Sequence, residues 1–181
     1  MMSEEKEERF ESALLQQGKI YLRGRINSEQ VDKIARLFLF LDAQENKEIV
    51  LYINSRGGNT EAGFDIYGIL KHVKSPITGV VLKEACSMAI LLLQACGKRK
   101  IMKNAILAFH DIGVSLGRSW RGYIEEAVRR VEAAEKEQND YNRIIAERSG
   151  IRAEEVSMLC EQAKILSAED ALKMGLVDEI I

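Results

Sequence analysis

The chain has 181 residues, of which 46% are hydrophobic and 30% charged, and its formal net charge is −2. This length and composition suit one compact domain with a buried core. No stretch approaches the roughly 18 uninterrupted apolar residues of a membrane span, and no long basic run would attract nucleic acid. We therefore expect a cytoplasmic protein that binds neither nucleic acid nor a membrane. The three cysteines are widely spaced, which predicts neither a disulfide framework nor a zinc site.

Hydrophobic patterning divides the chain into strands and helices. Apolar, β-branched runs bounded by turn residues predict buried strands, and apolar residues at helical spacing predict helices between them. Asn27 with Gln30, and Ser167 with Asp170, have the spacing of capping boxes and mark two helix starts. The expected strands cover residues 19–24, 48–53, 77–82 and 105–109 with a last one within 175–181, and the expected helices cover residues 27–42, 61–73, 88–96, 153–161 and 171–174.

This alternation indicates βαβ units with right-handed crossovers. The predicted fold class is therefore α/β, with a mostly parallel sheet covered by helices. The acidic residues 1–9 are expected to form a solvated leader, and residues 10–181 the single domain.

Residues 120–148 contain no Gly after Gly122 and no Pro, and their apolar positions keep a near-heptad spacing. This pattern predicts one unusually long helix. A helix of this length rarely packs along its whole length on one small core, so we expect part of it to project and to serve another subunit. An ordinary long surface helix is the alternative.

Ser87 stands between a buried strand and an apolar helix, where free backbone N–H groups collect at the helix N-terminus. Ala85 and Ala89 lie two positions on either side of it, as the glycines of a nucleophile elbow do. These features are typical of a serine nucleophile. A serine that only caps the following helix also fits them.

Two further groups could complete such a site. Gly57 and Gly58 occupy the loop after the preceding strand, which a parallel sheet can place beside the Ser87 turn. The N–H groups of Gly58 and Met88 would then stabilise the oxyanion of acyl transfer, although glycine pairs are also plain turn formers. His110 directly follows the next strand, at the sheet edge where α/β sites gather, and is placed to act as the base.

Several motifs resemble those of one family, the proteolytic subunit of the Clp protease, from about residue 10 to residue 181. Residues 51–58, Leu-Tyr-Ile-Asn-Ser-Arg-Gly-Gly, resemble its Tyr-Ile-Asn-Ser-Pro-Gly-Gly segment. Residues 85–88 resemble the Ala-Ala-Ser-Met that carries its nucleophile, and residues 109–110 match its Ile-His. Residues 166–178 resemble its C-terminal Ser-Ala-x-x-Ala and Gly-Leu-Val-Asp runs.

The resemblance implies a crotonase-like spiral of βαβ units and a homo-oligomer of two stacked heptameric rings, a tetradecamer that encloses a chamber. It implies a serine endopeptidase that degrades unfolded polypeptides delivered by an AAA+ Clp ATPase. That unfoldase uses ATP, whereas the peptidase needs no cofactor and no metal. Ser87 would be the nucleophile, His110 the base, and Gly58 with Met88 the oxyanion hole. Residues 120–148 would be the handle helix that interlocks the rings.

One departure from the family concerns the third catalytic residue. The family's catalytic aspartate falls on Ala163, and losing that acid from a chymotrypsin-type triad lowers turnover by about 10⁴. Glu161 is the nearest substitute, and Asp111, beside His110, is a weaker one. The chain therefore resembles a divergent paralogue. A catalytically impaired structural or regulatory subunit, in rings mixed with a paralogue, is the alternative function.

Two other chemistries remain open. A crotonase-like acyl-CoA enzyme would use the same backbone N–H groups for a thioester enolate and would need no nucleophile at Ser87. A serine and lysine dyad would use Lys83, although a lysine in an exposed turn is usually just solvated.

Overall fold

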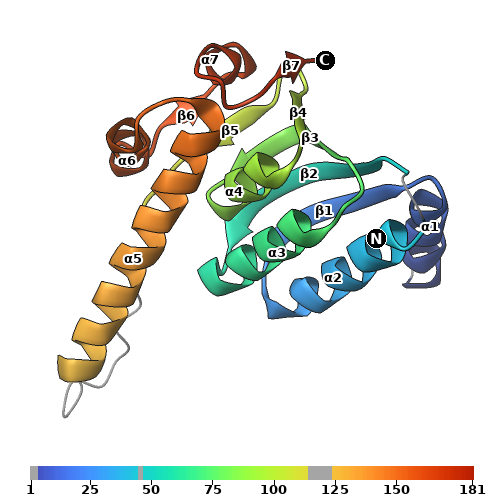
Figure 1. Ribbon diagram of the computed structural model, residues 1–181, viewed down its shortest axis with the longest axis horizontal. Helices are drawn as coiled ribbons and strands as arrows, with labels where there is room; N and C mark the ends of the chain where they lie inside the picture. Colours follow the sequence, from blue (N-terminus) through green and yellow to red (C-terminus); the bar gives the residue numbers. More distant parts are fainter. Residues whose placement is uncertain (1–3, 45–46, 114–123) are drawn as a thin grey trace.

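A computed structural model of the chain describes residues 4–44, 47–113 and 124–181. Helices and strands alternate along most of these residues and build an α/β domain around one sheet, as the hydrophobic pattern predicts (Figure 1). The strands are β1 Lys19–Ile26, β2 Ile49–Gly58, β3 Ile77–Cys86, β4 Lys98–Ile101, β5 Ile106–Ala108, β6 Ile165–Leu166 and β7 Glu179–Ile180. The helices are α1 Glu4–Gln16, α2 Ser28–Asp42, α3 Thr60–His72, α4 Met88–Ala95, α5 Ile124–Ser149, α6 Ala153–Glu161 and α7 Ala168–Lys173.

The seven described strands form one sheet, with the order β1, β2, β3, β4, β7 along its main path. β2 pairs with one edge of β3, while β4 and β5 pair with the first and second halves of the other edge. These pairs are parallel, as are β1 with β2 and β4 with β7. Among the described strands, only β5 and β6 pair in the antiparallel direction. The carboxyl ends of β1, β2, β3 and β5 therefore lie together at one edge of the sheet.

α4 forms the centre of the core. Each residue from Met88 to Gln94 is buried, because α4 contacts β2 and β3 of the sheet as well as α3 and α5. An eight-residue helix that is apolar except for Gln94 suits this enclosed place.

α5 projects away from the rest of the domain (Figure 1). Its buried residues, Tyr141, Asn142, Ile144 and Ile145, all lie in its C-terminal half, whereas Ile124 in its first turn is 78% exposed. The expectation of a long helix that leaves the core is thus confirmed from residue 124 onward. The expected first residues of this helix, 120–123, lie outside the described residues.

Several segments differ from the sequence-based expectation. Residues 54–58 and 83–86, expected as a loop and a turn, continue β2 and β3, because β1 and β5 provide strand partners for them. β4, with the sequence Lys-Arg-Lys-Ile, was missed because its residues are mostly charged. Residues 4–9 of the expected leader belong to α1, which packs on β1.

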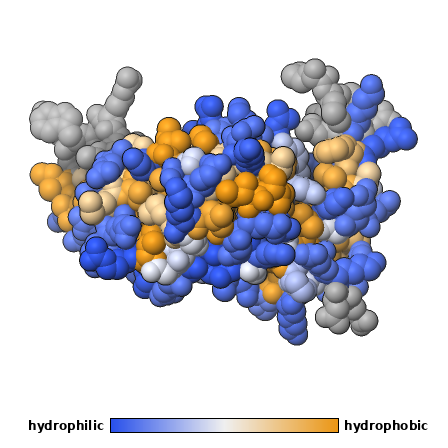
Figure 2. Space-filling view, turned by 90° about the horizontal axis from the view of Figure 1, so that it is seen from above, coloured by the Kyte–Doolittle hydropathy of each residue, from blue (hydrophilic) through white to orange (hydrophobic). Residues whose placement is uncertain are grey.

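Apolar side chains also remain on the surface. Figure 2 shows hydrophobic patches among hydrophilic side chains on the face seen from above. The exposed large apolar residues include Phe10, Leu39, Phe40, Met158 and Ile165. Apolar surface of this kind favours contacts with other protein chains.

None of the described helices combines the length and the apolar character needed to cross a membrane.

Candidate active site

Ser87 lies on a strained turn between β3 and α4. Its φ of 51° and ψ of −124° are rare for a residue with a side chain, and such strain costs roughly 1–3 kcal/mol. Two contacts with distant segments hold the turn: the Ser87 N–H donates to the Ala108 carbonyl at 2.9 Å, and the Tyr141 hydroxyl donates to the Ser87 carbonyl at 3.2 Å. A sharp, strained turn from strand to helix is the geometry of a nucleophile elbow.

The Ser87 side chain does not cap α4. Its hydroxyl accepts no hydrogen bond from the first turn of that helix. By contrast, Asn27, Asn59 and Ser167 each cap the helix that follows them by accepting a backbone N–H three residues on. Helix capping therefore does not explain why a serine stands at position 87.

The glycine pair at the end of β2 lies against the Ser87 turn. Gly57 has a φ of 77°, and a Cβ added to it would come 2.5 Å from the Cys86 carbonyl oxygen and 3.1 Å from the Met88 nitrogen. The Ser55 hydroxyl accepts the Gly57 N–H at 3.1 Å and fixes the loop. The Met88 N–H has no acceptor within its own helix, because it is the first of α4. The two backbone segments expected to form an oxyanion hole are thus in contact.

His110 lines a groove of about 560 Å³ together with Gly57 and Gly58. Its Nδ1 lies 2.8 Å from the carbonyl oxygen of Asp111. A carbonyl oxygen only accepts, so this contact requires the proton on Nδ1 and leaves Nε2 of the neutral ring as an acceptor. No hydrogen bond joins the His110 ring to the Ser87 hydroxyl in the described part of the chain.

Ala163 and His110 lie just beyond the paired residues of β6 and β5. The Phe109 N–H donates to the Lys164 carbonyl at 2.8 Å, and Ala163 and His110 are the next residues beyond these two along the chain. Ala163 has a φ of 47° and ends α6 in the left-handed region.

Neither candidate substitute for the missing acid is hydrogen-bonded to the His110 ring through its carboxylate. Glu161, the last residue of α6, is exposed and accepts a hydrogen bond from the Ser157 hydroxyl at 3.1 Å. Asp111 is also exposed, and only its backbone carbonyl bonds to the ring. Within the described ranges, the hydrogen bond that a triad acid would make to Nδ1 is therefore made by a backbone carbonyl.

Comparison with known proteins assigns the chain to a family. A family model described as Clp protease matches residues 2–181. The chain belongs to the Clp protease family. A solved structure, an asparagine-to-aspartate mutant of ClpP1 from Listeria monocytogenes, is similar with a TM-score of 0.83 at 26% sequence identity, and the match covers 95% of each chain. The resemblance and the Clp-like α/β fold are thus confirmed, and the family implies serine peptidase activity.

In this Clp protease family member, α5 contacts both halves of the candidate site. Besides the Tyr141 contact with the Ser87 turn, Gln138 accepts the Ile112 N–H at 2.9 Å and so holds the loop after His110. The Gln138 side chain in turn donates to the buried Asn142 at 2.9 Å. No motif marks these α5 residues, and their only signal in the sequence is a polar residue amid the apolar positions of a long helix.

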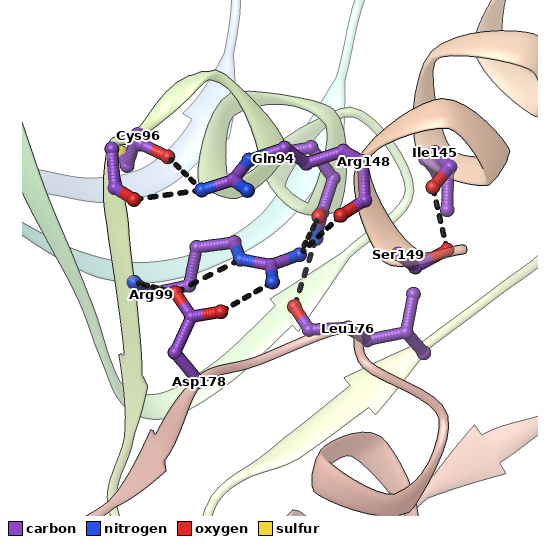
Figure 3. A network of polar contacts seen from close by, with 9 residues as sticks. Gln94, Cys96, Arg99, Ile145, Arg148, Ser149, Leu176 and Asp178 are labelled. Atoms are coloured by element: carbon purple, nitrogen blue, oxygen red, sulfur yellow. Dashed lines mark hydrogen bonds and ion pairs between the residues drawn. The ribbon is translucent and has the colours of Figure 1, made fainter.

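A buried arginine anchors the far end of α4 to the C-terminal segment (Figure 3). The Arg99 side chain, 4% exposed, forms an ion pair with Asp178 and donates to the Gln94 side chain at 2.6 Å. Gln94 also donates to the Leu176 carbonyl at 3.1 Å. The hydrogen bond from Arg99 lowers the pKa of Asp178. α4 is therefore held at one end by the Ser87 turn and at the other by this network.

Proposed function

We propose that this Clp protease is a serine endopeptidase in which Ser87 attacks the peptide carbonyl and His110 takes its proton. The strained backbone of Ser87 carries the proposal, because it presents a hydroxyl with no capping role beside the glycine pair. The N–H groups of Gly58 and Met88 would hold the oxyanion, and water would release the acyl-enzyme. The reaction needs no metal and no cofactor.

The environment of His110 supports a slow but functional base. The Asp111 carbonyl selects the tautomer in which Nε2 accepts a proton, which is one task of the usual acid. A neutral carbonyl stabilises the resulting imidazolium less than a carboxylate does, because it carries no full charge. We therefore expect turnover well below that of a complete triad, unless Glu161 moves to the imidazole when rings assemble.

We further propose that the chains form two stacked heptameric rings, a tetradecamer, in the cytoplasm. In its chamber they would cut unfolded polypeptides delivered by an AAA+ Clp ATPase that uses ATP. The projecting half of α5 supports assembly, since it presents a stripe of apolar side chains that its own domain leaves exposed, namely Ile124, Val128 and Val131.

A fluorophosphonate probe tests the chemistry. We expect it to label Ser87, and we expect His110→Ala to abolish labelling. Ala163→Asp should increase the labelling rate, by up to about 10⁴, because its carboxylate would stand beside the imidazole. Ala163→Asn is the matched control, since asparagine also tolerates a positive φ but carries no charge. An assembled ring that stays unlabelled, or labelling that survives His110→Ala, would overturn the proposal.

Ala163 also supports a second candidate function, a catalytically impaired subunit that tunes rings shared with a paralogue. Fluorogenic peptides and size-exclusion chromatography separate the two. Cleavage that appears only after mixing with the paralogue, and that persists when Ser87 is alanine, favours the structural subunit. Robust cleavage by the purified homo-oligomer excludes it.

A further inference from the structure

We propose that the groove at the candidate site selects peptides with acidic side chains near the scissile bond; this substrate class rests on the proposed function. The groove that His110 and the glycine pair line is strongly cationic. Besides His110, its charged residues are four cations and one anion, namely Arg23, Arg25, Arg56, Lys83 and Glu84.

Most of this positive charge is not neutralised. Arg56 lies 3.2 Å from the Glu84 carboxylate, so the single anion of the groove is already paired. Arg23, Arg25 and Lys83 are exposed, and none of them forms an ion pair with another described residue. The groove thus has a net charge of about +3 on a chain whose formal net charge is −2.

These cations flank the glycine pair and His110, the two parts of the candidate site that line the groove. Arg25 is the register partner of Gly57 across β1 and β2, and Arg56 directly precedes Gly57. Lys83 lies on β3 next to Glu84. Glu84 pairs with Ile106 of β5, and Ile106 is four residues before His110. An extended peptide rises about 3.3 Å per residue, so side chains one or two residues from the scissile bond lie within about 7 Å of it. The flexible Arg and Lys side chains can reach carboxylates at that range.

A peptide suits the groove better than single-stranded nucleic acid, which the same charges would attract. Nonspecific binding of single strands relies on aromatic side chains on which the bases stack. No Phe, Tyr or Trp is among the described residues that line the groove.

Equilibrium binding to the full-length Ser87→Ala variant tests the preference without requiring turnover. Short fluorescein-labelled peptides that differ only in carrying Glu, Gln or Lys are compared by fluorescence anisotropy. With each exposed ion pair contributing up to about 1 kcal/mol, we expect the Glu peptide to bind about 5- to 30-fold more tightly than the Gln peptide. The difference should shrink between about 0.1 M and about 1 M NaCl, where the Debye length falls from about 10 Å to about 3 Å.

Two double variants locate the effect. Arg25→Gln with Lys83→Gln removes two groove cations, and Arg36→Gln with Lys71→Gln removes two exposed cations of α2 and α3 that do not line the groove. Only the first pair should abolish most of the preference. Equal binding of the three peptides, a preference that survives the groove substitutions, or tighter groove-dependent binding of an oligonucleotide of equal charge would overturn the inference.

Labelling of Ser87 and selectivity for the Glu peptide are separate results, so the proposed function and the charge preference can fail independently. If the fluorophosphonate probe does not label Ser87 but the Glu peptide still binds selectively through the groove, the serine chemistry fails and the charge preference stands. If Ser87 is labelled and the enzyme cleaves Glu and Gln peptides with equal kcat/KM, the preference fails and the serine chemistry stands.

Discussion

Replacing Gly57 by alanine tests whether the close approach of the glycine loop to the Ser87 turn is needed. A Cβ at position 57 would lie 2.5 Å from the Cys86 carbonyl oxygen and 3.0 Å from the Ser87 Cβ, in a residue whose φ is 77°. The positive φ costs an L-residue roughly 1–2 kcal/mol, and overpacking adds about 1–3 kcal/mol. We expect Gly57→Ala to lower the free energy of unfolding by about 2–5 kcal/mol and to displace the Ser87 turn.

Gly150→Ala is the matched control. Gly150 has a φ of 83°, but no atom lies within 4 Å of a Cβ built there, so only the backbone cost of roughly 1–2 kcal/mol applies. Urea denaturation measures both losses, and fluorophosphonate labelling of the folded proteins reports on the site. Gly57→Ala should lose labelling while Gly150→Ala keeps it. Equal losses of stability, with labelling intact in both variants, would refute this reasoning.

Three further predictions concern stability and reactivity. Ala163→Gly should raise the free energy of unfolding by about 0.5–1 kcal/mol in urea denaturation, because glycine relieves the strain of a φ of 47°; a loss of stability would contradict this. Asp178→Asn should make the free energy of unfolding fall less steeply as the pH is lowered. The Arg99 hydrogen bond depresses the folded pKa of Asp178, so its stabilisation is present above the unfolded pKa of about 3.9 and lost as the pH falls through the folded value. Acid unfolding is followed by circular dichroism for the parent and the variant. The same pH dependence of stability in both would rule out a contribution from Asp178. Cys96 and Cys160 should resist a thiol reagent at about pH 8 in the folded protein, because burial raises their pKa values to about 12 and about 11. Fast reaction of either thiol without denaturant would show that its site opens.

The hydrophobic pattern predicted most elements, because burial of apolar side chains acts over a few neighbouring residues. The helix at residues 153–161 and the caps at Asn27 and Ser167 follow from such local chemistry. The carboxyl end of β3 could not be predicted in this way. Residues 83–86 look like a turn, and they form a strand because β5, some twenty residues later, pairs with them.

For the candidate site, the sequence alone determined which groups are available: a serine before an apolar helix, a glycine pair after a strand, and a histidine after another, with no acid at position 163. Only the tertiary structure decided how they are held. The positive φ of Ser87, the contact of Gly57 with Met88 and the bond from Phe109 to Lys164 depend on β2, β3, β5 and β6 lying side by side. Local side-chain chemistry sets which residues begin a helix or strand. The packing of distant segments sets the register, and the register places the reacting groups.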